Sequence, residues 1–133
     1  MRKINKIILH CSATREGQDN INAKTIDRWH KARGWNGIGY HYVILIDGTI
    51  EFGRPIEQVG AHTKGANSDS IGVVYIGGVE SDGKTPKDTR TDAQKESMTR
   101  LFAFFEMVNP DLLVYCHNQF SNKACPSFNI EDL

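Results

Sequence analysis

Apolar residues gather in short runs separated by polar, glycine-rich segments, and two of these runs lead into a histidine. The first run covers residues 6–11 and contains His10, and the last covers residues 112–115 and is followed by His117. Short runs without alternation are typical of strands buried on both faces. If these two strands are parallel neighbours, their carboxyl ends meet at one sheet edge. Both histidines would then project into the crevice where α/β proteins place their sites.

Helical periodicity predicts two helices. The first covers residues 23–33, with Asn22 as its N-cap. The second begins after Thr91, which forms a capping box with Gln94, and continues to about residue 108. Its apolar stripe consists of Met98, Leu101, Phe102, Phe105 and Val108. A stripe at helical spacing indicates core packing.

The remaining apolar runs predict further strands. Asp47-Gly48 lies between β-rich runs at 40–46 and 49–52 and indicates an antiparallel hairpin. Residues 71–76 form another buried run, whereas residues 53–69 show no periodicity and read as a long functional loop. Strands that alternate with helices predict an α/β fold, a central mixed β-sheet with helices packed on its faces.

Length and charge restrict the class of protein. The 133 residues suit a single domain, 1–133, without a separate binding module, and 16 basic residues balance 16 acidic ones. This neutrality argues against nucleic-acid binding, which needs a basic surface. We expect no membrane span, because no apolar stretch is long enough. The N-terminal apolar run is too short for a signal peptide, and cleavage would remove His10, so we expect cytoplasmic synthesis.

Three residues are candidate metal ligands: His10, His117 and Cys125. Imidazole and thiolate are ligands that zinc prefers, and three of them leave the fourth tetrahedral position open, as in catalytic sites. The alternative is structural, because cysteine is commonly a small buried hydrophobe and histidine a hydrogen-bonded core residue. The spacing follows none of the standard zinc patterns. The residues alone therefore leave both interpretations open.

Several motifs resemble one family, the type-2 N-acetylmuramoyl-L-alanine amidases, which include the phage lysozyme-type amidases and are similar to the peptidoglycan recognition proteins. The match runs in order along nearly the whole chain. Its segments are His10-Cys11-Ser12-Ala13-Thr14, Arg33-Gly34-Trp35, Ile38-Gly39-Tyr40-His41-Tyr42, Asp47-Gly48-Thr49-Ile50, Gly60-Ala61-His62, Asn67-Ser68, Ser70-Ile71-Gly72-Val73, His117 and Lys123-Ala124-Cys125-Pro126. The resemblance implies the same α/β architecture.

The resemblance also implies the chemistry. One Zn²⁺ per chain would be held by His10, His117 and Cys125, with Tyr40 and Lys123 as catalytic groups. The reaction would be hydrolysis of the amide between N-acetylmuramic acid and L-alanine in peptidoglycan. Without the resemblance, Tyr40 would read as a strand-edge aromatic residue and Lys123 as a solvated loop cation.

Substrate contacts are predicted at His62 and Asn67. The expected partner is peptidoglycan or a muropeptide, and we expect a monomer that acts on the cell wall after release, as a phage endolysin does. A non-catalytic peptidoglycan-recognition module is the alternative function. Such modules typically lack the cysteine ligand, so Cys125 favours the enzyme. The sequence is silent on a third role, a regulatory protein that binds a partner.

Overall fold

A mixed five-stranded β-sheet forms the centre of the molecule, which the computed structural model describes over residues 2–133. The strand order is β4-β3-β5-β1-β7, and only β4 runs antiparallel to its neighbour. The strands are β1 (Lys6–Cys11), β3 (Tyr42–Ile44), β4 (Ile50–Phe52), β5 (Ser70–Tyr75) and β7 (Leu113–Cys116). A small second sheet pairs β2 (Thr14–Arg15) with β6 (Gly78–Val79). The predicted α/β fold with a mixed sheet is confirmed.

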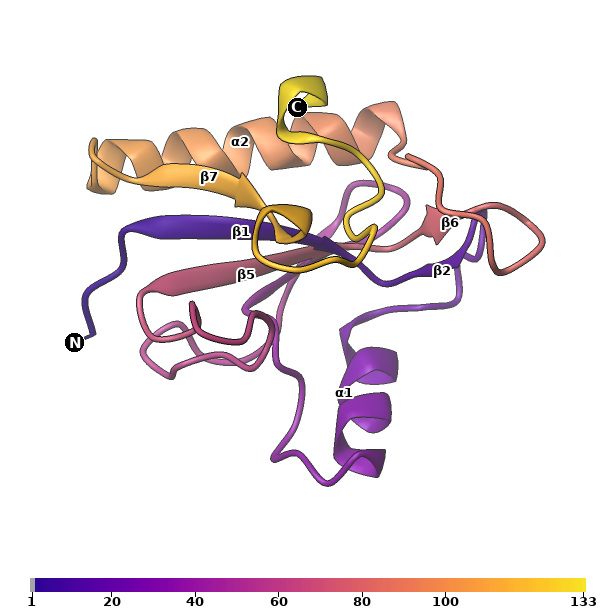
Figure 1. Cartoon of the computed structure of the whole chain (residues 1–133), viewed down its shortest axis with the longest axis horizontal. Helices are drawn as coiled ribbons and strands as arrows, with labels where there is room; N and C mark the ends of the chain where they lie inside the picture. The colour runs from indigo at the N-terminus through magenta and orange to yellow at the C-terminus, as the bar shows by residue number, and fades with distance from the viewer. Residues whose placement is uncertain (1) are drawn as a thin grey trace.

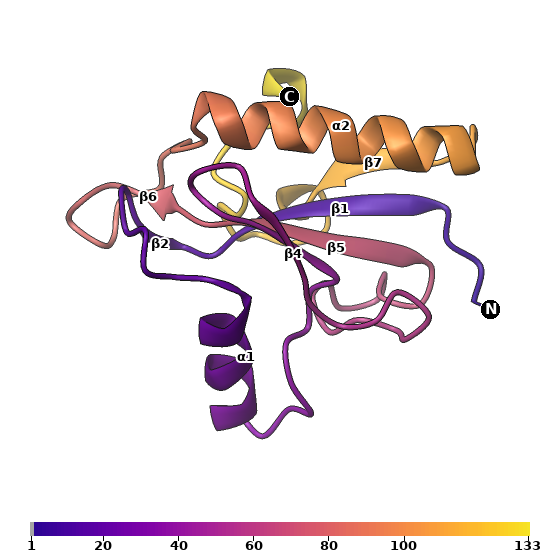
Figure 2. The ribbon, with the colours of Figure 1, turned by 180° about the vertical axis from the view of Figure 1, so that it is seen from behind.

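Two α-helices lie on opposite sides of the sheet, as Figures 1 and 2 show. They are α1 (Ala23–Ala32) and α2 (Asp92–Val108). The Asn22 side chain accepts from the backbone N–H of Thr25 (3.1 Å) and begins α1. Thr91 and Gln94 form the predicted capping box at the start of α2. No helix within residues 2–133 has the length and apolar character needed to cross a membrane.

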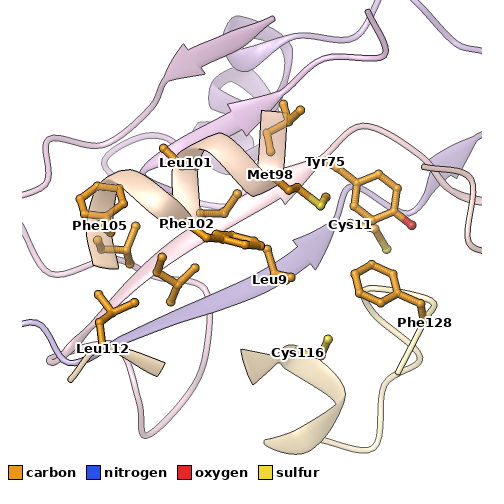
Figure 3. Packing of buried hydrophobic residues seen from close by; sticks show 14 residues of the cluster. Leu9, Cys11, Tyr75, Met98, Leu101, Phe102, Phe105, Leu112, Cys116 and Phe128 are labelled. Carbon is orange, nitrogen blue, oxygen red and sulfur yellow. The ribbon is translucent and has the colours of Figure 1, made fainter. Parts of the chain in front are cut away.

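The larger core lies between α2 and the sheet (Figure 3). Its members are Ile7, Leu9, Cys11, Ile44, Ile71, Val73, Tyr75, Met98, Leu101, Phe102, Phe105, Leu112, Cys116 and Phe128. Val108 was predicted to join this stripe, but its side chain is 70% exposed. At about 100° per residue, Val108 lies about 70° from the centre of the stripe and turns toward solvent.

A smaller core lies on the other face, beneath α1. It contains Ile26 from α1 together with Val43, Val74 and Ile76. Because side chains alternate along a strand, β1 directs Ile7, Leu9 and Cys11 toward α2, and His10 toward the opposite face. The register pairs Leu9 of β1 with Cys116, the last residue of β7. The residues that follow these two in the chain, His10 and His117, therefore lie at the same edge of the sheet.

The hairpin forms at the predicted turn, although its strands are shorter than the apolar runs. Gly48 adopts a left-handed φ of 89°, which suits glycine at this turn. Residues 53–69 contain no helix or strand, as predicted for a long loop. This loop returns the chain to the start of β5, and it carries His62 to the sheet edge beside His10.

Candidate metal centre and catalytic cavity

The three predicted ligands meet at the carboxyl ends of β1 and β7. His10 is the last residue but one of β1, His117 begins the 3-10 helix η1 (His117–Gln119), and Cys125 lies in the loop that follows. One potential ligand atom from each residue lies within 4.8 Å of the other two. The Nδ1 atom of His10 is 3.8 Å from the Sγ atom of Cys125. Bonds of about 2.1 and 2.3 Å at a tetrahedral angle would separate nitrogen and sulfur by about 3.6 Å, so this spacing suits zinc.

His117 provides an independent test of that fit. Its Nδ1 atom is buried, and it finds no hydrogen-bond partner within residues 2–133. Buried polar atoms in folded proteins almost always have a partner. A cation between His10, His117 and Cys125 would satisfy this nitrogen, so the residues present fit a zinc ion.

The protonation states of the ligands also suit a metal. Burial lowers the pKa of His10 well below its ordinary value. The pKa of His117 is lowered mainly by burial and to a smaller extent by the positive charge of Lys123. Both imidazoles are therefore neutral and able to bind a cation. A hydrogen bond with the Cys11 thiol, together with burial, raises the pKa of Cys125. A metal must displace that thiol proton, so its affinity should rise with pH.

The far side of the His10 ring contacts His62. The Nε2 atom of His10 is 2.9 Å from Nδ1 of His62 and 3.3 Å from Oγ1 of Thr63. Asn67 holds this turn, because its Oδ1 atom accepts from the backbone N–H groups of His62 (2.9 Å) and Thr63 (2.8 Å). Substrate contact by His62 and Asn67 stays a prediction. Both residues line the cavity described below, and His62 also lies within hydrogen-bonding distance of the side chains of His10, Thr63 and Ser70.

A cavity of about 530 Å³ opens beside the three candidate ligands, and His117 forms part of its wall. Its lining includes Arg33, Trp35, Tyr40, Lys64, His117 and Lys123. Three of these side chains are cationic, and no carboxylate lines the cavity within the described residues 2–133. On a chain with equal numbers of acidic and basic residues, this concentrates positive charge at the site.

Tyr40 and Lys123 both reach this cavity. The Tyr40 ring lies 5.0 Å from the His10 ring, measured between centroids. Burial raises the pKa of Tyr40, so the phenol stays protonated and can act as a donor. Lys123 is exposed, and its charge lowers the pKa values of both His10 and His117, as expected for an ammonium group near the ligands. Their catalytic roles remain predictions.

The other two histidines serve the scaffold. His41 is buried and accepts from the backbone N–H of Gly72 (3.0 Å). His30 lies on α1 and is only 6% exposed. Its Nδ1 atom accepts from the backbone N–H of Gly39 (2.9 Å) and thereby ties α1 to the loop before β3. Helical periodicity alone could not reveal this partner.

A His-His-Cys group at the carboxyl ends of parallel strands, open to a cavity, has the ligand number and the location of a catalytic metal site in an α/β enzyme. Residues 1–128 match the family model described as N-acetylmuramoyl-L-alanine amidase. The chain belongs to this family, and it is an enzyme of that amidase class.

Known relatives agree with this assignment. The chain is 37% identical over 130 residues to an endolysin of Klebsiella phage KP32, which covers 98% of this chain and 85% of that protein. The solved structure of the endolysin LysCS from Clostridium intestinale URNW, an N-acetylmuramoyl-L-alanine amidase, superimposes with a TM-score of 0.80 at 31% identity, covering 96% of this chain and 78% of that one. The peptidoglycan recognition proteins LCa and LCx, solved with tracheal cytotoxin, give a TM-score of 0.78 at 28% identity, covering 95% and 77%.

Proposed function

We propose that this chain is a zinc-dependent endolysin that hydrolyses the amide between N-acetylmuramic acid and L-alanine in peptidoglycan. The observation that carries the proposal is the group formed by His10, His117 and Cys125, in which a buried nitrogen lacks a partner. One zinc ion per chain is expected in a single catalytic domain that acts as a monomer on the wall. The endolysin relative and the recognition proteins solved with tracheal cytotoxin support the choice of substrate.

The ligands provide a site of the catalytic kind. Two neutral imidazoles, from His10 and His117, and the Cys125 sulfur would hold the ion and leave one coordination position for water or substrate. When bound, zinc polarises the amide carbonyl and lowers the pKa of its bound water. One thiolate among the ligands reduces the net charge of the site. Neighbouring donors are therefore needed to stabilise the charge that develops in the reaction.

Two groups of the cavity can supply that help. Lys123 carries an ammonium group that would donate to the oxyanion developing on the carbonyl oxygen. Tyr40 carries a protonated phenol that would hydrogen-bond the attacking water or transfer a proton. Both side chains line the same cavity as His117, which supports their action on one bound substrate.

The charge of the cavity fits the peptide part of the substrate. Peptidoglycan stem peptides carry free carboxylates, and the cavity lining contains Arg33, Lys64 and Lys123. Unlike charges attract over several ångströms, and this attraction weakens as salt is added. We therefore expect substrate affinity to fall with ionic strength.

Digestion of purified peptidoglycan tests the proposal. The zinc-loaded enzyme should release free amino groups on L-alanine without new reducing sugar ends, because no carboxylate lines the cavity within residues 2–133 and glycosidic cleavage needs a pair of them. A chelator should abolish the reaction, and added zinc should restore it. The matched variant Cys125→Ala should lose zinc affinity and activity together. New reducing ends without released peptide, or cleavage that persists in the metal-free protein, would overturn the assignment.

A further inference from the structure

We propose that His62 is a positioning residue of the metal centre, which fixes the tautomer and the orientation of the His10 ring. Its Nδ1 atom would accept a hydrogen bond from Nε2–H of His10, so that His10 presents the unprotonated Nδ1 to the metal. The inference rests on the proposed zinc site and assigns a role to a residue outside the three ligands.

The geometry around His10 determines which nitrogen carries the proton. Its Nδ1 atom faces the Cys125 sulfur at 3.8 Å, and its Nε2 atom faces His62 at 2.9 Å. A neutral imidazole has one N–H and one lone pair, so metal binding through Nδ1 leaves the proton on Nε2. The His10 side chain is only 1% exposed, so this N–H needs a protein acceptor. His62 Nδ1 is the nearest, and the Thr63 hydroxyl at 3.3 Å is a second.

The hydrogen bonds beyond His62 are consistent with donation from His10 to His62. His62 can accept at Nδ1 only if its own proton lies on Nε2, and that atom is 3.3 Å from Oγ of Ser70. The Ser70 hydroxyl donates to the carbonyl oxygen of Ala66 (2.6 Å), which leaves its lone pairs free to accept. The chain from His10 through His62 and Ser70 to Ala66 therefore gives each donor an acceptor.

Two glycines leave the space that the His62 ring occupies. A Cβ atom at Gly60 would lie 2.6 Å from Cδ2 of His62, and one at Gly72 would lie 2.5 Å from the same atom. Side chains do not approach so closely, so only glycine at these two positions allows the ring to lie flat between the backbones. The Asn67 side chain holds the backbone at His62 and Thr63, because its Oδ1 atom accepts from both of their N–H groups. The ring is thus oriented by the protein before any metal binds, as is usual for groups that orient metal ligands.

A purely substrate-binding His62 would need a ring nitrogen free to reach the substrate. Both nitrogens of His62 instead have protein partners, His10 with Thr63 on one side and Ser70 on the other. These contacts favour orientation of the ligand over contact with the substrate.

Zinc affinity of matched variants tests the role. His62→Leu removes the acceptor and keeps an apolar side chain of similar reach, whereas His62→Asn keeps an oxygen near the position of Nδ1. Zinc dissociation constants would be measured by competition with a chromophoric chelator at fixed pH. We expect His62→Leu to bind zinc about 10- to 100-fold more weakly, the usual loss for such partners. His62→Asn should recover most of this loss.

Gln94→Leu is the control for lost stability. The Gln94 side chain is fully buried and donates to the carbonyl oxygens of Ile44 (3.3 Å) and Ile76 (3.1 Å), away from the cavity. This variant should unfold more easily and yet keep the wild-type zinc affinity in its folded state. An equal loss of zinc affinity in Gln94→Leu and His62→Leu would mean that general destabilisation, and not His62, governs the metal site.

Nitrogen-15 NMR of the zinc-loaded wild type provides a second readout that needs no variant to fold. His10 should show a metal-bound Nδ1 and a proton on Nε2, and His62 should carry its proton on Nε2. Binding of zinc through Nε2 of His10, or a proton on Nδ1 of His62, would overturn the inference. So would unchanged zinc affinity in His62→Leu. Wild-type protein that binds no zinc would instead refute the proposed function itself.

Discussion

Mild acid should strongly destabilise the metal-free protein, because its histidines are neutral in the folded state. All five histidines have lowered pKa values, and burial is the largest cause for each: His10, His30, His41, His62 and His117. In the unfolded chain a histidine binds a proton with a pKa of about 6.5. The unfolded state therefore binds more protons below that pH, and the free energy of unfolding falls as the pH falls.

The magnitude follows from the two most deeply affected rings. The pKa of His62 is lowered to about 3, and that of His10 lies well below its ordinary value. At pH 5.5, protonation of one histidine stabilises the unfolded chain by about 1.4 kcal/mol, so the two together account for about 3 kcal/mol. Natural domains are stable by about 5–15 kcal/mol, so this loss is a large fraction. The other three histidines add to it.

Urea unfolding of chelator-treated protein at pH 7.5, 6.5 and 5.5, followed by circular dichroism, would measure the effect. Carboxylates with lowered pKa values, such as Asp82, lose their contribution only below this range. The variant His62→Asn should show a pH dependence smaller by about 1.4 kcal/mol between pH 7.5 and 5.5, because one titrating group is gone. A free energy of unfolding that stayed constant, or rose, between pH 7.5 and 5.5 would refute the reasoning.

Three substitutions separate catalysis from metal binding and packing. Lys123→Ala should keep its zinc and its muropeptide affinity but turn over about 100- to 1000-fold more slowly, as for a lost oxyanion donor; wild-type turnover, or a lost metal, would contradict its catalytic role. Tyr40→Phe should be slowed less if water replaces the hydroxyl, and single-turnover rates beside zinc content would test it. Gly72→Ala should cost about 1–3 kcal/mol of unfolding free energy and weaken zinc binding, because the new Cβ collides with the His62 ring; urea unfolding and zinc titration at wild-type values would contradict that.

Local signals in the sequence were enough to predict most of the fold. The strand expected at residues 6–11 matches β1 residue for residue, because consecutive apolar residues at 7–9 indicate a strand buried on both faces. Capping by Asn22 and Thr91 depends on side chains three residues away, and Asp47-Gly48 determines its own turn. The proximity of His10, His117 and Cys125 could be predicted because parallel strands bring their carboxyl ends together, and the family resemblance chose among the residues there.

Several other features that depend on contacts between distant segments were not predicted. The contact that buries His30 is with the backbone of Gly39, nine residues away in the loop before β3. The partner of His62 lies on β1, 52 residues away, and the loop that carries His62 has no periodicity. The position of the His62 ring depends on Gly60 and Gly72, which leave room for it. Neither glycine, taken alone in the sequence, indicates that a histidine ring lies against it.

The proposed ligands come from two different kinds of structure, an inner strand of the sheet and a segment of turns. His10 belongs to β1, which has strands on both sides, whereas His117 and Cys125 lie on a segment of turns after the last strand. Native proteins open locally at such segments with far less free energy than global unfolding requires. Exchange of the bound ion should therefore proceed by opening of residues 117–125 while the sheet stays intact. Amide hydrogens of β1 would then remain protected from solvent exchange during metal release.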